Sequence, residues 1–305
     1  MKIKILKRED IEDKVWNGCV HFAHNPRPYG YTWYLDNICE NWEGMVLGNY
    51  HAVFPLVFNR KFGIDYLFQP FFAQQLGIFS RIGFNEALFT MFFENIPEKY
   101  KYIDIYLNEM NEFRYPDYEL TPRVNLLLNL NKSYETLFES YSKNLKRNLK
   151  KADKHKLHIT AGISPERMVE LFKNNPGSKV KALKDKEYHT LHRVIHHSIY
   201  YGVGQVIGVL NENRELISAG FFIFDKKRIY NILPASNAEG KEKCAMHHLI
   251  NYIILSNAGT KKTLDFEGSM IESIANFFKS FGAEETRYWH LKRNILPWYL
   301  KMLKN

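Results

Sequence analysis

The stretch "GQVIGVLNENRELISAGFFIFDKKRIYNILPAS" at residues 204–236 decides the fold. It holds three apolar runs separated by polar turn residues at Asn211–Asn213 and Asp225–Lys227. This pattern is typical of antiparallel strands joined by hairpins. An amphipathic run from about Lys243 to Leu255 then predicts a helix, and "TLDFEGS" at residues 263–269 predicts a further strand. The second half of the chain is therefore expected to form a three-stranded meander, a helix and a strand.

The first half repeats this order. Residues 43–70 contain three short strand patterns, with turns near Asn49 and at Asn59–Phe62. An apolar helix is expected around Asn85–Phe93, followed by the strand "YIDIYLN", in which Asp104 takes the place that Asp265 has in the second half. Strands, a helix and a strand, seen twice, predict two similar α/β (α+β) domains, each a mixed, mostly antiparallel sheet flanked by helices.

Composition limits the class of protein. The chain has 305 residues, 45% of them hydrophobic, and a net charge of +9, which favours a phosphate-bearing or polyanionic partner. Cys19, Cys39 and Cys244 form neither a CxxC pair nor an even framework. His192 and His196 are spaced for one helix face but lack the glutamate of an H-E-x-x-H motif, so no metal site is expected. With no signal-peptide core and no run of about 18 apolar residues, a cytoplasmic protein without a transmembrane segment is expected.

A charged helix is predicted at residues 131–156, between the two repeats. One side carries an apolar stripe, and the other side is basic. The basic side includes Lys143, Arg147, Lys150 and Lys151, which we interpret as a grip on phosphates. The alternative is an ordinary solvated face.

An acidic strand end is predicted at "LDFEGSM", residues 264–270. Because side chains alternate along a strand, Asp265 and Glu267 are expected on one face and Leu264 and Phe266 on the other. Ser269 and Glu272 have the S-x-x-E spacing of a capping box, which predicts a helix start.

Three stretches resemble the FemAB-type acyltransferases. "YSKNLKRNLKKADKHKLHI" is similar to that family's basic-helix signature, and "LDFEGSMIESIANFFKSFGA" is similar to its later signature, with "FQPFFAQQLGIFS" as a third point of similarity. The resemblance implies two tandem GNAT-like domains, placed at residues 1–152, which end in the basic helix, and at residues 153–305. It also implies transfer of an acyl or aminoacyl group from an activated, phosphate-bearing donor to an amine, in a cleft between the domains.

The resemblance also suggests site residues in the second domain. Asp265 or Glu267 would accept a proton or position the acceptor amine, and Lys279 matches the lysine of the family's Phe-Lys element. Lys279 would then contact the donor's phosphate or the developing oxyanion. The alternatives are a salt-bridged strand end for Asp265 and a helix C-terminal cation for Lys279.

A second element that GNAT domains use is the loop before the helix of the second repeat, which cradles a pyrophosphate in that fold. Gly240, Lys241 and Lys243 suit this role because a helix N-terminus attracts anions. The Gln/Arg-x-x-Gly-x-Gly/Ala pattern is not present, which counts against coenzyme A, and a plain polar loop is the alternative.

An acceptor pocket is predicted in the first domain. Tyr29, Trp33, Gln69 and Gln75 supply rings and amides around a Pro-rich loop and a strand end. Packing of Trp33 in the core is the alternative.

Three functions therefore stay open. The first is an N-acyltransferase that uses a coenzyme A thioester as donor, with no permanently bound cofactor, on a small-molecule or peptide amine. The second is an aminoacyl-tRNA-dependent transferase that acts on a peptidoglycan precursor or a protein. The third is a non-catalytic binding protein on the same scaffold.

Overall fold

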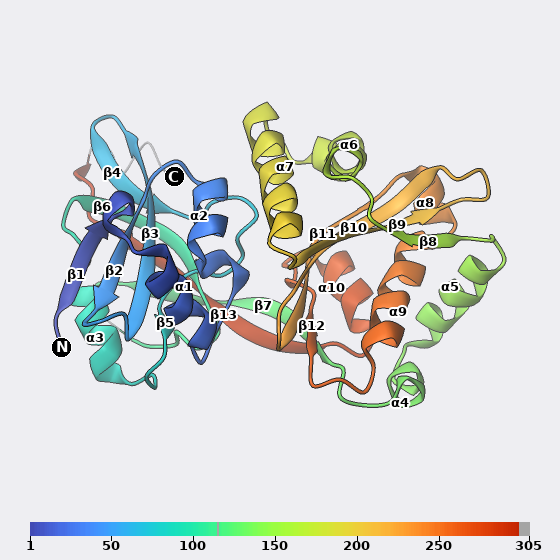
Figure 1. Ribbon diagram of the computed structural model, residues 1–305, viewed down its shortest axis with the longest axis horizontal. Helices are drawn as coiled ribbons and strands as arrows, with labels where there is room; N and C mark the ends of the chain where they lie inside the picture. Colours follow the sequence, from blue (N-terminus) through green and yellow to red (C-terminus); the bar gives the residue numbers. More distant parts are fainter. Residues whose placement is uncertain (115, 299–305) are drawn as a thin grey trace. The chain divides into compact units, whose positions relative to one another are not determined.

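The computed structural model describes residues 1–114 and 116–298 (Figure 1). The chain forms two compact units. Unit 1 contains Met1–Arg123 and the chain from Arg287 onward, and unit 2 contains Val124–Thr286. The sequence places the domain boundary at residue 152, after the basic helix. In the structure the chain instead passes from one unit to the other within two strands, β7 (Glu119–Asn129) and β13 (Glu284–Asn294).

Unit 1 begins with a strand and two helices, continues with the predicted meander, and ends with a helix and a strand. The elements are β1 (Ile3–Lys7), α1 (Asp13–Phe22), α2 (Thr32–Ile38), β2 (Trp42–Leu47), β3 (Ala52–Lys61), β4 (Ile64–Phe68), β5 (Phe79–Ser80), α3 (Glu86–Glu94) and β6 (Tyr100–Leu107). Short 3-10 turns lie at Arg8–Asp10 and Pro28–Gly30.

Unit 2 repeats this order after two additional helices. The elements are α4 (Tyr134–Glu139), α5 (Lys143–Asp153), β8 (His158–Ala161), α6 (Pro165–Asn174), α7 (Asp185–Tyr200), β9 (Gly204–Leu210), β10 (Leu216–Phe224), β11 (Arg228–Ser236), α8 (Ala238–Glu242), α9 (Ala245–Asn257), β12 (Thr263–Asp265) and α10 (Glu272–Lys279). A 3-10 turn lies at Gly177–Lys179.

The two sheets have corresponding strand orders. In unit 1 the order is β1-β2-β3-β4-β6-β13, and in unit 2 it is β8-β9-β10-β11-β12-β7. In both, the meander is antiparallel and its third strand pairs in parallel with the strand after the helix. The predicted repeat of mixed, mostly antiparallel sheets is confirmed.

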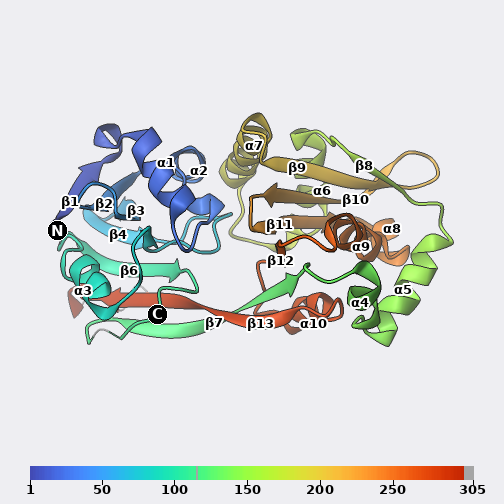
Figure 2. The same ribbon diagram turned by 60° about the horizontal axis from the view of Figure 1, so that its bottom comes forward.

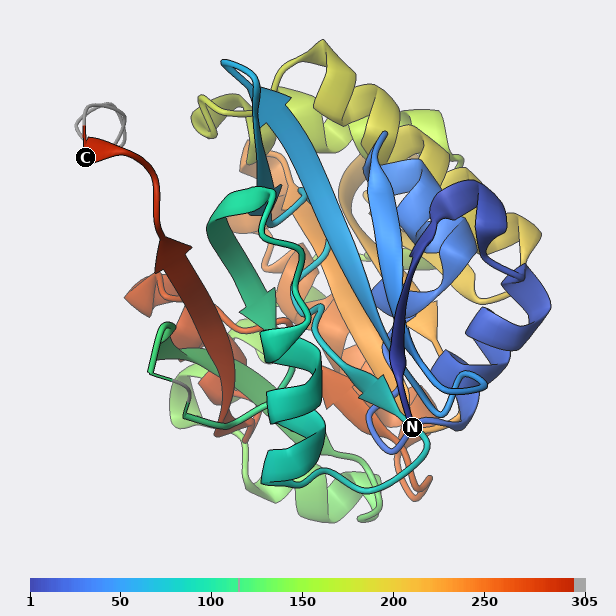
Figure 3. The same cartoon turned by 90° about the vertical axis from the view of Figure 1, so that its left-hand side faces the viewer.

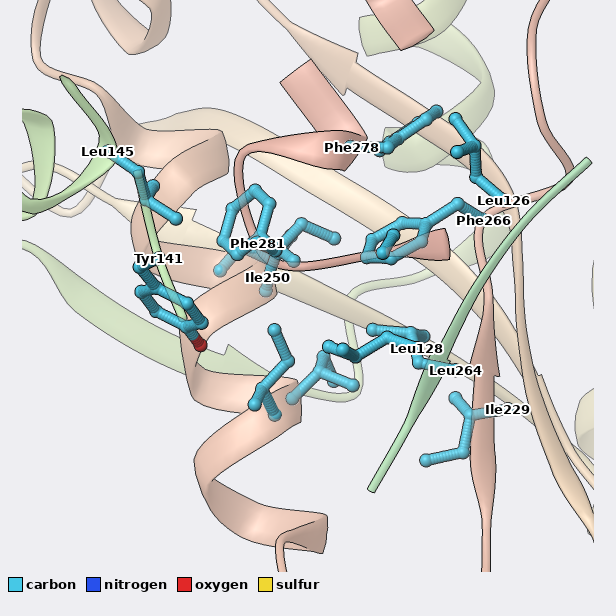
Figure 4. Packing of buried hydrophobic residues seen from close by; sticks show 14 of the residues in the cluster. Leu126, Leu128, Tyr141, Leu145, Ile229, Ile250, Leu264, Phe266, Phe278 and Phe281 are labelled. Atoms are coloured by element: carbon cyan, nitrogen blue, oxygen red, sulfur yellow. The ribbon is translucent and has the colours of Figure 1, made fainter. Parts of the chain in front are cut away.

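Helices cover both faces of the unit 2 sheet. α6 and α7 lie on one face, and α9 and α10 lie on the other, with α5 beside α9 (Figure 1, Figure 2). Leu264 and Phe266 point to the α9 and α10 side, as their alternation predicts, and Phe266 stacks on Phe278 with ring centroids 4.6 Å apart (Figure 4). Burying such apolar surface stabilises the fold by roughly 25 cal/mol per Å².

Helices also cover both faces of the unit 1 sheet at β2 and β3 (Figure 3). α3 packs on the face that carries Ile103 and Ile105 of β6. α1 packs on the opposite face, where a Cβ on Gly44 would lie 2.4 Å from the ring of Trp16, so β2 needs a glycine there. The side chains of β6 that face away from α3 include Tyr102, which is half-buried.

The structure corrects three local predictions. The helix predicted at residues 131–156 is two helices, because Ser142 has extended backbone and caps α5 by accepting a hydrogen bond from the Leu145 amide. The predicted capping box is not formed, since the Ser269 hydroxyl accepts from the Ile271 amide and α10 begins later. β12 ends at Asp265, so the predicted alternation does not extend to position 267.

Candidate functional site

A cavity of about 510 Å³ lies in unit 1, over the ends of β4 and β6. Aromatic rings dominate its lining, and one carboxylate stands among them. The lining residues are Tyr66, Phe68, Gln69, Pro70, Phe71, Phe72, Ala73, Tyr102, Asp104 and Tyr106. A predominantly aromatic cavity with few polar groups is typical of a ligand site.

Strand register explains why these side chains meet. Phe68 of β4 lies beside Asp104 of β6, and His290 of β13 lies opposite Tyr106. Alternate residues of a strand share a face, so Tyr102, Asp104 and Tyr106 all point away from the α3 core. The cavity is thus built on a sheet surface, and the loop after β4 supplies one of its walls.

Asp104 is held by hydrogen bonds on both of its oxygens. The Tyr102 hydroxyl donates to Oδ2 at 2.7 Å, and Nε2 of His290 lies 2.7 Å from Oδ1. Burial acts to raise the pKa of Asp104, but these hydrogen bonds and the nearby Lys292 outweigh it and hold the pKa below its usual range. Burial and the carboxylate together raise the pKa of Tyr102 well above its usual value. Asp104 is therefore an ionised carboxylate with 33% of its side chain exposed.

Neighbouring rings and amides hold this group in place. The Tyr106 ring contacts the His290 ring edge to face at 4.8 Å, and the guanidinium of Arg123 lies 5.4 Å from the Tyr106 ring centroid. The Gln69 side chain accepts a hydrogen bond from the Tyr106 amide and donates one to the Ala73 carbonyl, which ties the loop to β6. We call Tyr102, Asp104 and His290 the Asp104 cluster.

The structure brings one of the four predicted acceptor-pocket residues to this cavity. Gln69 lines it, as just described. Tyr29 is buried against Tyr34, and Gln75 is buried next to Gln74. Trp33 is half-buried on α2, in contact with the rings of Tyr31 and Tyr34. These three do not line the cavity in the described part of the chain.

Local sequence patterns point to few residues of the cavity and of the Asp104 cluster. The repeat gave Asp104 as the counterpart of Asp265, but Tyr102 and Tyr106 were not recognised, although a polar residue at every second position of "YKYIDIYLN" is a signal for one solvent-facing strand surface. His290 lies 186 residues from Asp104 in the chain, and no local pattern links the two.

In unit 2, Asp265 occupies a buried structural position. Its side chain is 1% exposed and accepts hydrogen bonds from Asn125, from Arg228 at 2.9 Å and from the amide of Glu267. Asp265 is thus in an ion pair with Arg228, as the alternative of a salt-bridged strand end predicts. Glu267 is half-buried in a turn and has a left-handed φ of 58°. Gly268 follows with φ 52°, and a Cβ there would lie 2.3 Å from the Val124 carbonyl oxygen.

Lys279 is the last residue of α10. Its ammonium lies 2.6 Å from a carboxylate oxygen of Glu285, and both side chains are about half exposed. Its place at the helix C-terminus also suits a cation that meets the helix dipole. The catalytic assignment of Glu267 and Lys279 stays a prediction.

The basic residues of α5 lie on the surface of unit 2. Leu145, Leu149 and Ala152 are buried against the core, which leaves the other side of the helix in solvent. We call the exposed cations Lys143, Arg147, Lys150 and Lys151 the basic face of α5. No carboxylate of residues 1–114 and 116–298 forms an ion pair with these four side chains.

The loop predicted to cradle a pyrophosphate forms the short helix α8 instead. The Gly240 amide is hydrogen-bonded to the Asn237 side chain at 2.8 Å. Lys243 forms an ion pair with Glu239 at 2.7 Å. The Glu239 carboxylate also accepts a hydrogen bond from the Asn211 side chain. Gly240 is needed because a Cβ would lie 2.1 Å from the Ile217 carbonyl oxygen. Lys241 alone of the three predicted residues is exposed there.

The two sheets, with their repeated order and exchanged last strands, define a tandem GNAT-like fold. Among solved structures, FemX is similar, with a TM-score of 0.68 and 14% identity over 100% of both chains. A conserved protein of unknown function from Bacteroides thetaiotaomicron has a TM-score of 0.63 and 11% identity over 93% of this chain and 98% of that one. A tandem GNAT protein from the clavulanic acid biosynthesis pathway has a TM-score of 0.51 and 9% identity over 97% and 99%.

These similarities confirm the fold expected from the FemAB-like motifs. No protein-family model matches the sequence, and no curated protein sequence matches it. Among the described residues, no helix is both long and apolar enough to cross a membrane.

Proposed function

We propose that the protein transfers an acyl or aminoacyl group to an amine, and that the Asp104 cavity binds the acceptor amine as an ammonium. The observation that carries this proposal is an ionised carboxylate exposed in an aromatic cavity. The tandem GNAT-like fold supports acyl transfer in general.

The chemistry of the cavity fits a primary ammonium group. Asp104 offers a fixed negative charge, and the faces of Tyr66, Phe68 and Tyr106 attract a cation through their ring quadrupoles. A neutral alcohol of the same size would gain the apolar contacts and one hydrogen bond to Asp104, but not the attraction between opposite charges. The cluster therefore selects charge as well as shape.

Asp104 serves the ammonium as an anchor more than as a strong base. Its lowered pKa makes it a weak proton acceptor in the ground state. The bound ammonium first loses one proton to solvent, because only the neutral amine has the lone pair that attacks the donor carbonyl. After attack the nitrogen is far more acidic, and the Asp104 carboxylate then suffices to receive its second proton. The C–N bond forms, the bond from the carbonyl carbon to the leaving oxygen or sulfur breaks, and the leaving group takes this second proton.

The donor is proposed to be carried on a polymer of phosphates, such as an aminoacyl-tRNA. Several exposed cations along α5, which form no ion pair with the described residues, suit a series of phosphates, whereas a lone pyrophosphate needs one or two. The loop expected for coenzyme A is engaged in its own hydrogen bonds and ion pair, which favours the polymer over the thioester.

A transfer assay tests the function. The protein is incubated with a labelled aminoacyl-tRNA or labelled acetyl-coenzyme A and with cadaverine as acceptor, and the amide product is detected by mass spectrometry. We expect product with the aminoacyl-tRNA and at least a tenfold loss for Asp104→Asn. Cadaverine binding without product from either donor would instead support the non-catalytic binding protein, and product that is insensitive to Asp104 would refute the acceptor site.

A further inference from the structure

A second cavity lies in unit 2, between α6 and the turn that joins β9 to β10. Its volume is about 490 Å³, and its lining is mainly polar and charged, unlike that of the Asp104 cavity. Beside it, α6 packs against β10 and β11 (Figure 1). Charged groups of both signs share this cavity. The lining residues are Arg167, Glu170, Leu171, Asn174, Asn175, Arg214, Glu215, Leu216 and Asn237.

One side of α6 supplies several chemically different groups to the cavity. Arg167, Glu170 and Asn174 are three and four positions apart, so they share a side of the helix. Leu171 lies on the border of that side, is 8% exposed, and gives the cavity apolar surface together with Leu216 of β10. The helix thus contributes a cation, a carboxylate, an amide and an apolar contact.

The turn between β9 and β10 is held by Asn211, which is 2% exposed. The Asn211 side chain accepts hydrogen bonds from the amides of Asn213 and Glu215, and it donates one to the Glu215 carboxylate at 2.8 Å. Between them, Arg214 has a left-handed φ of 63°, which is costly for a residue other than glycine. The backbone of this wall is therefore fixed before a ligand arrives, which lowers the entropic cost of binding.

The two arginines of the cavity have no side-chain partner in the described part of the chain. Within residues 1–114 and 116–298, neither Arg167 nor Arg214 forms an ion pair, although Glu170 and Glu215 line the same cavity. Glu170 forms no ion pair with these residues either. A guanidinium group binds a carboxylate or a phosphate through paired, charge-assisted hydrogen bonds. The cavity can therefore hold an anionic group between its own cations.

The balance of charge decides which kind of anion fits. Two arginines and two glutamates give the lining a formal charge of zero. A phosphate dianion would be attracted by the guanidinium groups and repelled by both carboxylates. A zwitterion instead offers each sign of charge an opposite partner, and the two leucines favour an apolar group between the charges.

We propose that this cavity binds a free α-amino acid with an aliphatic side chain. The carboxylate of the ligand pairs with the guanidinium groups of Arg167 and Arg214, and its ammonium pairs with Glu170. Its side chain contacts Leu171 and Leu216. All of these residues belong to unit 2, so the site is distinct from the Asp104 cavity and the proposal goes beyond the proposed function.

Calorimetric titration with L-leucine tests the site, with three probes that each lack part of the ligand. L-leucinamide lacks the carboxylate, 4-methylpentanoate lacks the ammonium, and inorganic phosphate is an anion without an apolar part. We expect L-leucine to bind and each probe to bind roughly tenfold more weakly or worse, because each loses a charge-assisted contact. Phosphate that binds as tightly as L-leucine would overturn the zwitterion assignment, and absence of leucine binding would overturn the site.

Substitutions place the ligand in the cavity. Arg214→Gln and Glu170→Gln each remove one charge from an exposed side chain and are expected to weaken leucine binding roughly tenfold, with Tm unchanged. Arg81→Gln, which removes an exposed arginine of unit 1, is the matched control and should bind leucine like the wild type. Leucine affinity unchanged in both cavity variants would overturn the proposal.

A further variant separates this site from the Asp104 cavity, which is proposed to attract an ammonium too. Asp104→Asn is expected to retain leucine binding. Loss of leucine binding in Asp104→Asn, with retention in Arg214→Gln, would assign the ligand to unit 1 and overturn the proposal.

The outcome is separable from that for the proposed function. If leucine binds through Arg214 but no amide product forms in the transfer assay, the enzyme proposal fails and the amino-acid site stands. If product forms but leucine does not bind, the amino-acid site fails and the enzyme proposal stands.

Discussion

Replacing Asp104 by asparagine is expected to remove the preference of the cavity for a cation. The variant keeps the size of the side chain and one acceptor for the cluster, but it removes the negative charge. A hydrogen bond to a charged group contributes about 1.5–3 kcal/mol. Because 33% of the Asp104 side chain is exposed, solvent screening places the expected loss near the lower end, about 1.5–2 kcal/mol, which corresponds to roughly 10- to 30-fold weaker binding.

The assay is an NMR titration with n-butylammonium and with neutral n-pentanol. The wild type is expected to bind the ammonium more tightly, and Asp104→Asn is expected to bind both about equally. Asp117→Asn, which removes an exposed carboxylate elsewhere in unit 1, is the control and should retain the preference. Unchanged ammonium affinity in Asp104→Asn would refute the reasoning that Asp104 anchors a cation.

Three further predictions concern stability and charge. Folding lowers the pKa of Asp104, so its ionised carboxylate stabilises the fold above the unfolded pKa of about 3.9, and this stabilisation is lost as the pH falls through the folded pKa. In urea unfolding, Asp104→Asn should therefore have a lower free energy of unfolding than the wild type at pH 7, and the difference should shrink below about pH 4. Arg228→Gln leaves the buried Asp265 charge without its cation and should lower the free energy of unfolding by about 3 kcal/mol with an unchanged denaturant slope, and a loss under about 1 kcal/mol would contradict the buried pair. The double variant Arg147→Gln, Lys150→Gln should reduce the slope of log K against log salt for tRNA binding by about 1.4–1.8, whereas an unaltered slope would remove α5 from the interface.

The sequence placed Asp104 and Asp265 at corresponding positions of the repeat and favoured Asp265 as the candidate site residue. Asp104 and Asp265 both end up on a strand beside the third strand of a meander. Their environments differ because of residues remote in the chain. Asp265 is closed off by Asn125 and Arg228, whereas Asp104 meets His290 and a loop that leaves room for a cavity. Burial and partner choice are set by packing, so local pattern alone could not rank the two.

Local patterns by themselves determined the meander, the helices that follow it and the repeat. Alternation and turn residues act within about ten positions of the chain, which is why the strands at 204–210, 216–224 and 228–236 were predictable almost to the residue. Tertiary structure decided which strand completes each sheet, where the chain passes between units, and that β11 and β12 part after Tyr230. These features depend on hydrogen bonds and packing between segments that are distant in the chain. The free energies of such contacts cannot be inferred from any one stretch of sequence.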